Sequence, residues 1–255
     1  MSDQMDRTLE QRFQDVHIGA RENWGFVQAL RECFMVSLPI IGDALASYLD
    51  RSIRDTMGDA FPKNINPTSN AMILQNMATD KLAWARSTVD SACVVIIQAT
   101  LDAGMNDYLL LIAEVQPAIW ETATAEETVP LKTVKDTSYA DLLRARAAAA
   151  ARVLCTKSLS KKVQWILDKC YRADCVLAPS GFRFDIERLR KFDDLRHDIA
   201  HGRATCVTVE NMDEVLLFLH QTFLSVQALI SNHLGFSLDQ TREWERQTTV
   251  RSIRL

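Results

Sequence analysis

The sequence predicts an all-α protein. Glycine and proline are scarce, with 8 and 6 residues in a chain of 255, and long stretches contain neither, which favours helices over a turn-rich β architecture. Apolar residues recur every three or four positions, the period of a helix with one buried face. Hydrophobic residues make up 47% and charged residues 24%, close to globular averages, which argues against a disordered or fibrous chain.

The N-terminal part of the chain, 1–60, predicts three helices. A polar helix is expected over 4–17, an apolar helix over 24–38 that Pro39 stops, and a third helix over 41–56. The third helix carries an apolar stripe at helical spacing, made of Ile41, Leu45, Tyr48, Leu49, Ile53 and Met57.

A linker is predicted after these helices. The stretch FPKNINPTSN, residues 61–70, collects two prolines and three asparagines. We therefore expect two parts in the chain: a helical N-terminal extension over 1–66 and a helical bundle over 67–255.

The middle of the chain predicts further helices. A helix that starts near residue 70 is expected to break at Gly104 and Asn106, and a second helix over 106–121 is expected to bend or end at Pro117. The Thr-rich segment 122–137 is interpreted as an exposed loop.

Strong helix formers fill 139–157, and Ser160 is expected to cap the helix KKVQWILDKC that follows. A turn is expected at APSGF, residues 178–182. A long final helix over 210–233 carries an apolar face. The tryptophans Trp84, Trp120 and Trp165 are expected in the core, and His17, His220 and His233 are expected to have structural roles.

Between the turn and the final helix, Asp185 occupies the N-cap position of IERLRKFDDLRHDIA, and Gly202 follows where a helix-ending glycine is expected. Five apolar residues of this helix fall at three and four residue steps and should face the core: Ile186, Leu189, Phe192, Leu195 and Ile199.

Composition also bears on location and chemistry. No apolar run is expected to approach the roughly 18 to 20 residues needed to cross a bilayer, and the charged N-terminus lacks the apolar region of a secretory signal. We therefore expect a cytoplasmic protein without membrane contact, with its six cysteines reduced. No glycine-rich phosphate loop, serine nucleophile elbow or paired-carboxylate motif occurs, which argues against nucleotide hydrolysis and the common hydrolase classes.

Charge is unevenly distributed along this acidic chain. The net charge is −4, yet residues 142–203 hold 14 Lys and Arg against 7 Asp and Glu. A locally basic region is typical of a surface that binds polyanions, although helices also carry mixed charges on solvated faces. Substrate contacts to phosphate are expected from Lys161, Lys162, Arg190 and Arg203.

The basic segment ends in LRHDIAHG, residues 195–202, which carries the most reactive side chains of the sequence. His201 falls in the last helical turn, where the helix dipole favours a protonated imidazole by up to about 2 kcal/mol. Arg196 suits a phosphate as a bidentate donor. His197 and Asp198 are expected to support this pair. An imidazole and a guanidinium are sufficient for metal-free RNA cleavage, with no cofactor.

This segment resembles the arginine, four to six residues, histidine motif of the HEPN superfamily. Arg196, the polar His197 after it, His201 and Gly202 carry the resemblance, together with the amphipathic helix before them. The resemblance implies a helical bundle that dimerises so that both motif copies line one cleft. It also implies a metal-independent endoribonuclease of the kind found in toxin–antitoxin, abortive-infection and other antiviral defence systems, with RNA as substrate and an antitoxin or defence protein as a possible partner. Some HEPN toxins carry a modifiable tyrosine two residues after the histidine, where this chain has Arg203.

Geometry gives a separate reason to expect a second copy. Arg196 and His201 are five residues apart, about 140° around an ideal helix, so one straight helix does not place them on one face. Either the helix ends between them at Gly202, or a second copy of the segment packs opposite.

Two other interpretations stay open. His197 and His201 are four residues apart and could bind zinc with Cys170 and Cys175, although the segment from Cys175 to His197 is longer than the loop of a usual zinc finger. Alternatively, His201 caps its helix, Arg196 pairs with Asp193 or another nearby acid, and the chain is a non-catalytic helical interaction module, a scaffold or RNA-binding protein.

Overall fold

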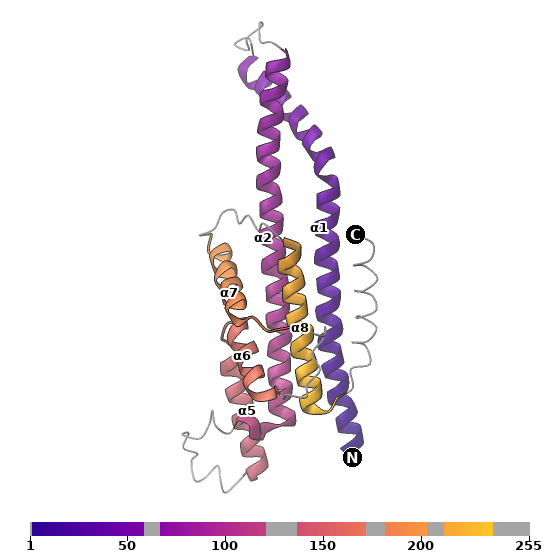
Figure 1. The fold of residues 1–255 in the computed structure, drawn as a ribbon, viewed down its shortest axis with the longest axis vertical. Helices are drawn as coiled ribbons and strands as arrows, with labels where there is room; N and C mark the ends of the chain where they lie inside the picture. Colours follow the sequence, from indigo (N-terminus) through magenta and orange to yellow (C-terminus); the bar gives the residue numbers. More distant parts are fainter. Residues whose placement is uncertain (1, 59–66, 121–136, 172–181, 203–211, 237–255) are drawn as a thin grey trace.

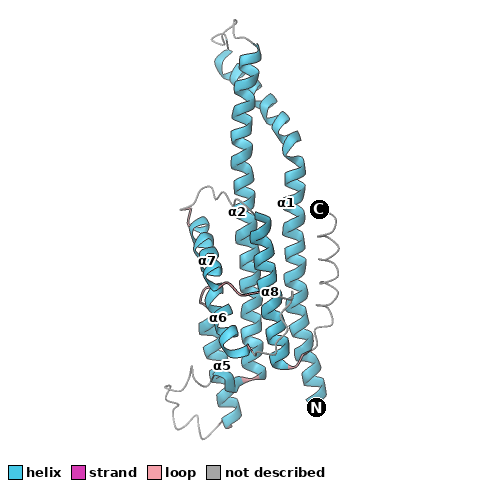
Figure 2. Ribbon diagram, in the orientation of Figure 1, coloured by secondary structure: helices cyan, strands magenta, loops and turns pink. Residues whose placement is uncertain are grey.

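The computed structural model describes residues 2–58, 67–120, 137–171, 182–202 and 212–236, and the predicted all-α class is confirmed there. Figure 2 shows helices and short connections but no strand in this part of the chain. Two long helices run side by side along the length of the molecule, and shorter helices pack around their lower half (Figure 1). The elements are α1 (Ser2–Met57), α2 (Pro67–Val115), the 3-10 helix η2 (Pro117–Trp120), α5 (Tyr139–Cys155), α6 (Leu159–Cys170), α7 (Ile186–Ala200) and α8 (Met212–Leu234).

The expected three N-terminal helices are one helix, so the prediction that Pro39 stops a helix is wrong. Pro39 lies inside the 56 residues of α1. An interior proline removes one backbone hydrogen bond and bends a helix rather than necessarily ending it. Figure 1 shows α1 bent in its upper half and packed along α2 over much of its length, so tertiary contacts offset the local cost of the proline.

The predicted break at Gly104 and Asn106 is also wrong, because α2 continues through both residues to Val115. Gly104 has a packing role instead. A Cβ atom there would lie 3.0 Å from Cε2 of Phe223 on α8, so glycine lets the two helices approach closely. The expectation at Pro117 is confirmed, since α2 ends at Val115 and η2 begins at Pro117.

The shorter helices begin close to the predicted residues. Ser138 caps α5 by accepting a hydrogen bond from the backbone N–H of Asp141. The N-cap of α6 is Ser158, not Ser160 as predicted, and Ser160 lies in the first turn. The predicted loop at 122–137 and the predicted turn at 178–182 lie mostly outside the described residues.

The core runs between α1, α2 and α8 and includes the N-terminal half of α1. Phe13 and Trp24 of α1 are buried in the same cluster as residues of α2 and α8. The ring of Phe13 lies 5.2 Å from that of Tyr108, and Trp24 stacks on His220 at 4.8 Å. The domain boundary between residues 66 and 67 stays a prediction, and the hydrophobic core contains residues from both sides of it.

Two histidines lie where α1 meets α8. Burial lowers the pKa of His220 to about 4, with smaller contributions from His17 and Arg21. Burial and Arg21 also lower the pKa of His17, opposed by a hydrogen bond with Gln227. Both imidazoles are therefore neutral packing groups near neutral pH, in line with the structural role predicted for them.

An ion-pair cluster marks the level at which the long helices leave the bundle. The Arg31 guanidinium of α1 contacts the carboxylates of Asp90 on α2 and Asp213 on α8, each at 2.7 Å. Beyond it, residues 33–57 of α1 and 67–88 of α2 form a projecting two-helix arm (Figure 1). Trp84 lies on this arm and is 57% exposed, so its predicted place in the core is wrong, whereas Trp120 is buried as expected.

Within the described residues, three helices are long and apolar enough to cross a membrane by length and composition, which corrects the expectation that no segment approaches this length. The stretches are Leu9–Met57, Met72–Val115 and Met212–Leu234. They differ in burial, since the most apolar window of α8 is 78% buried in the bundle and that of α1 is 0% buried.

Candidate functional site

The helix α7, which carries the candidate motif, is held by its N-cap and by its buried face. Asp185 accepts a hydrogen bond from the backbone N–H of Arg188 at 2.9 Å, as its predicted N-cap role requires. Leu189 and Phe192 are buried, and the guanidinium of Arg188 lies 4.4 Å from the ring centre of Phe218 on α8. The amphipathic pattern thus fixes which face of α7 meets the bundle.

Asp193 ties α7 to two other helices. One carboxylate oxygen accepts from the side-chain amide of Gln98 on α2 at 2.8 Å, and the other accepts from the backbone N–H of Ser160 at 3.0 Å. The second bond satisfies a free N–H group in the first turn of α6 and places a negative charge at its positive end. Asp193 therefore binds other helices of the bundle and does not pair with Arg196, one of the contacts that the interaction-module interpretation allows, whereas His201 is the C-cap of α7 as that interpretation expects.

The candidate residues gather at the C-terminal end of α7. Ala200 is the last helical residue, His201 is the C-cap, and Gly202 has a φ of 65°. This left-handed backbone is accessible to glycine at little cost, which confirms Gly202 as the predicted helix stop. The rings of His197 and His201 lie 4.3 Å apart and both side chains are exposed, whereas Arg196 and Asp198 are half-buried.

The helix end does not by itself bring Arg196 and His201 together. The backbone N–H of His201 donates to the carbonyl oxygen of His197 at 3.0 Å, so the helical geometry continues as far as His201. The neighbour of His201 within the chain is His197, as expected for residues four apart. Arg196 and His201 of one chain therefore lie about 140° apart around the axis of α7.

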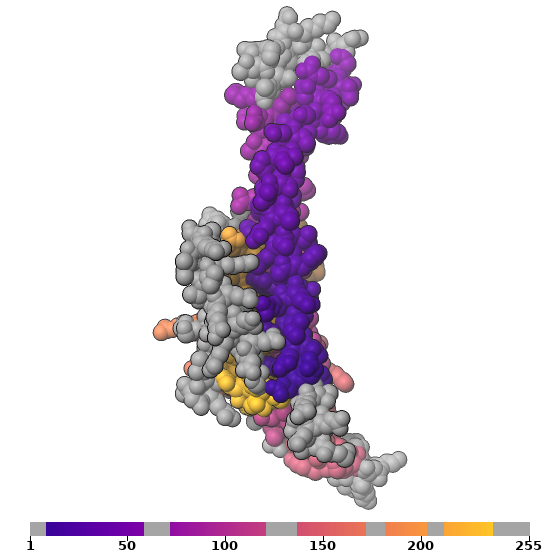
Figure 3. Space-filling view, turned by 90° about the vertical axis from the view of Figure 1, so that its right-hand side faces the viewer, coloured from indigo at the N-terminus to yellow at the C-terminus, as the bar shows by residue number. Residues whose placement is uncertain are grey.

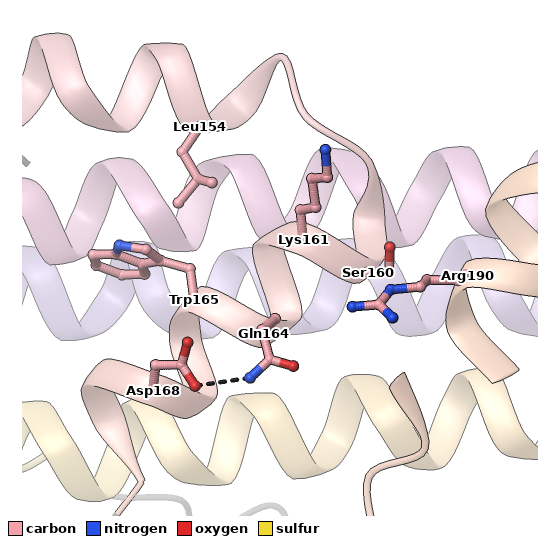
Figure 4. A pocket seen from close by; sticks show the side chains of 7 residues that line it. All are labelled: Leu154, Ser160, Lys161, Gln164, Trp165, Asp168 and Arg190. Carbon is pink, nitrogen blue, oxygen red and sulfur yellow. Dashed lines mark hydrogen bonds between the residues drawn. The ribbon is translucent and has the colours of Figure 1, made fainter. Parts of the chain in front are cut away.

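A small pocket lies between α5, α6 and α7 (Figure 4). It measures about 200 Å³ and is lined by Leu154, Ser160, Lys161, Gln164, Trp165, Asp168 and Arg190. It brings two of the predicted phosphate-binding residues, Lys161 and Arg190, to one rim. Figure 4 shows Arg190 directed toward the pocket, opposite the indole of Trp165.

The pocket has a rigid aromatic wall. Trp165 stacks on the buried Trp120 with ring centres 4.0 Å apart. Gln164 donates to Asp168 at 2.7 Å, and Arg190 forms an ion pair with Glu187 one turn earlier on α7. The lining therefore combines an aromatic wall with the cations of Lys161 and Arg190 and the carboxylate of Asp168, and the exposed indole face suits a planar ligand.

The predicted phosphate contact of Lys162 is wrong, because this side chain is buried. It is 0% exposed, and its ammonium contacts the carboxylate of Asp102 on α2 at 2.7 Å. Successive residues of a helix point about 100° apart, so Lys162 can face the core while Lys161 before it is exposed. Arg203, the last of the predicted contacts, lies outside the described residues.

The zinc interpretation involves four residues that the structure separates or does not describe. Cys170 is buried in the core, whereas His197 and His201 are exposed at the end of α7. Cys175 lies outside the described residues. Within the described ranges, no group of three His, Cys, Asp or Glu side chains is placed to hold a metal ion.

Sequence reasoning misses two features of the site. The spacing of three residues favours Arg196 as the partner of Asp193, and nothing local indicates the actual partners on α2 and α6. The sequence also predicts Trp165 in the core. Val163 and Ile166 face the core, and Trp165 lies on another side of α6, where it borders the surface and lines the pocket.

Comparison of the chain with protein-family models, with curated proteins and with solved structures finds no match.

Proposed function

We propose that this chain is a HEPN-like, metal-independent endoribonuclease whose active site forms between two copies of α7. The observation that carries the proposal is the composition of the helix end: two adjacent exposed imidazoles and a half-buried guanidinium, in the basic part of the chain. Among the described residues, no carboxylate forms an ion pair with Arg196, His197 or His201, so no described ion pair competes with an anionic ligand for these three side chains.

These groups can catalyse RNA cleavage by transesterification. A neutral His201 accepts the proton of the ribose 2′-hydroxyl as its oxygen attacks the adjacent phosphorus. A protonated His201 from the second copy donates a proton to the 5′-oxygen as the P–O bond breaks. Arg196 stabilises the additional negative charge on the phosphorane. The products are a 2′,3′-cyclic phosphate and a 5′-hydroxyl, and the step needs neither metal nor cofactor.

A second copy supplies what one chain lacks. Within one chain His201 lies beside His197, and Arg196 points elsewhere around the helix. A twofold axis near the end of α7 would place the Arg196 of each copy against the His201 of the other. His197 and Asp198 then act by orienting His201 and adjusting the local charge.

The pocket extends the same surface. Arg190 lies eleven residues before His201, about 16 Å along the axis of α7 and about 20° around it, so both lie on one side of the helix and one RNA strand can reach both. We propose that a neighbouring base stacks on Trp165 while Lys161 and Arg190 contact its phosphate. This pocket would bind single-stranded RNA next to the cleaved bond.

Such an activity fits a growth-arresting toxin or an antiviral defence effector in the cytoplasm, held in check by an antitoxin or defence partner. A non-catalytic interaction module is the second candidate. The observation that favours it is the exposed apolar surface of the two-helix arm, which suits a protein partner.

The test is cleavage of total cellular RNA in EDTA by wild type, Arg196→Ala and His201→Ala, with Arg152→Ala as a surface control on α5. We expect cleavage by wild type and by the control, with 5′-hydroxyl ends, and loss of at least about a hundredfold in both site variants. Unchanged cleavage by a folded His201→Ala protein would refute the site. A well-folded wild type that cleaves no RNA but binds a protein tightly would support the module instead.

A further inference from the structure

The middle of α1, from Phe26 to Tyr48, carries an apolar face that nothing in the described structure covers. Seven exposed, uncharged residues form it: Phe26, Leu30, Cys33, Val36, Ile40, Ala44 and Tyr48. We call them the α1 stripe. Val36 and Ile40 are 79% and 74% exposed. At about 100° per residue the seven positions fall within about a third of the helix circumference.

This face differs from the one that packs on α2. The buried residues Trp24 and Val27 and the ion-paired Arg31 lie on another side of α1. Figure 3 shows α1 facing the viewer along the arm. The most apolar window of α1 is 0% buried, with a mean hydropathy of 1.3. An apolar surface of this length on a helix indicates an interaction site.

Charges at the two ends of the stripe indicate its partner. Glu22 and Arg51 lie in the same sector of the helix, and neither forms an ion pair among the described residues. Glu22 precedes Val36 by as many residues as Arg51 follows Ser37. The two charges are therefore symmetric about the middle of the stripe. Two antiparallel copies centred between Val36 and Ser37 would therefore bring Glu22 of each copy to the level of Arg51 of the other.

We propose that the α1 stripe is a self-association surface on which a second copy of this chain packs antiparallel, with Glu22 and Arg51 pairing at both ends. Such a twofold interface is self-complementary, and end charges of this kind set the register and direction of paired helices.

A lipid bilayer is the less suitable partner. Glu32 and Asp43 lie on the same part of α1, outside the stripe, and Asp80 and Lys81 lie on the adjacent part of α2. Insertion of the arm would bury these charges in hydrocarbon, which is costly. Helix pairing through the stripe leaves them in water.

This interface is separate from the proposed active site. In Figure 1, α1 and α7 lie on opposite sides of the molecule, with α2 and α8 between them. A chain that uses both surfaces forms an assembly larger than a dimer, and disruption of the stripe halves its mass without removing the α7 pairing.

The test is sedimentation equilibrium of the full-length chain. We expect Ile40→Glu to halve the mass of the assembly, while Val153→Glu, an exposed apolar control on α5, leaves the mass unchanged. Arg51→Glu should weaken association about tenfold because it places two glutamates opposite each other, and Glu22→Arg in the same chain should restore it.

Equal masses of wild type and Ile40→Glu would overturn the proposal. Flotation with phosphatidylcholine vesicles provides the other decisive outcome: if wild type floats and Ile40→Glu does not, the stripe binds lipid and the proposal is wrong. RNA cleavage in EDTA by Ile40→Glu and His201→Ala reports on the proposed function independently of these masses.

Discussion

The buried ion pair between Lys162 and Asp102 gives the sharpest prediction about stability. The Lys162 side chain is 0% exposed and that of Asp102 is 27% exposed, with 2.7 Å between the charged atoms. Asp102→Asn keeps the shape of the side chain and removes the counter-charge of a buried ammonium. Loss of one partner of a buried pair costs about 3 to 5 kcal/mol, and because Asp102 is partly exposed we expect about 3 kcal/mol.

The partner substitution should behave differently. Lys162→Met removes the buried charge and leaves a carboxylate that can reach water, so it should cost about 1 kcal/mol or less. Adding Lys162→Met to Asp102→Asn should recover most of the loss. Urea denaturation followed by circular dichroism, at one fixed protein concentration, measures the unfolding free energies. An Asp102→Asn loss below about 1 kcal/mol, or a Lys162→Met loss equal to it, would refute the assignment of Lys162 to the core.

Three further predictions concern the pocket, the helix cap and pH. Alanine at Lys161 or Arg190 should weaken RNA binding and reduce the slope of log affinity against log salt by about 1 for each phosphate interaction removed, as measured by fluorescence anisotropy; an unchanged slope would exclude a phosphate contact. Asp185→Ala should lower the unfolding free energy by about 1 kcal/mol through loss of the N-cap, measured in urea, and Asp185→Asn should largely preserve it. The unfolding free energy should fall as pH drops from about 6.5 to about 4, because the unfolded chain binds protons on His17 and His220 that the folded chain, with its lowered pKa values, resists. His220→Phe should reduce that pH dependence, and an identical pH profile would contradict it.

The sequence predicts much of the helical layout because local signals and packing agree there. Asp185 and Gly202 mark the start and end of α7 through a side-chain cap and a left-handed backbone, both of which depend on nearby residues alone. Leu189 and Phe192 are buried as their spacing predicts.

The wrong predictions come from long-range contacts that override local preference. Pro39 and Gly104 are helix breakers by propensity, yet α1 and α2 continue through them because each packs along a neighbouring helix. The partners of Asp193 lie on α2 and α6 and that of Lys162 lies on α2, all far away in the sequence, so neither residue's role was predictable from its surroundings.

The helix end that carries the candidate residues was predicted, and its catalytic role stays a prediction. LRHDIAHG indicated polar side chains where the helix ends at Gly202, and His197 and His201 are exposed there. The pocket required three helices to meet, and Trp165 could not be assigned to it from spacing alone.

Subunit mixing tests the composite active site most directly. An Arg196→Ala dimer has no motif arginine and a His201→Ala dimer has no motif histidine, so each is expected to be inactive. A mixed dimer holds one of each, supplied by different chains. After the two variants exchange subunits, we expect RNA cleavage in EDTA to reappear at a rate below that of wild type, because the mixed dimer sets Arg196 of one chain against His201 of the other but lacks the second His201 as acid. A mixture as inactive as its parents would contradict a site shared between two copies.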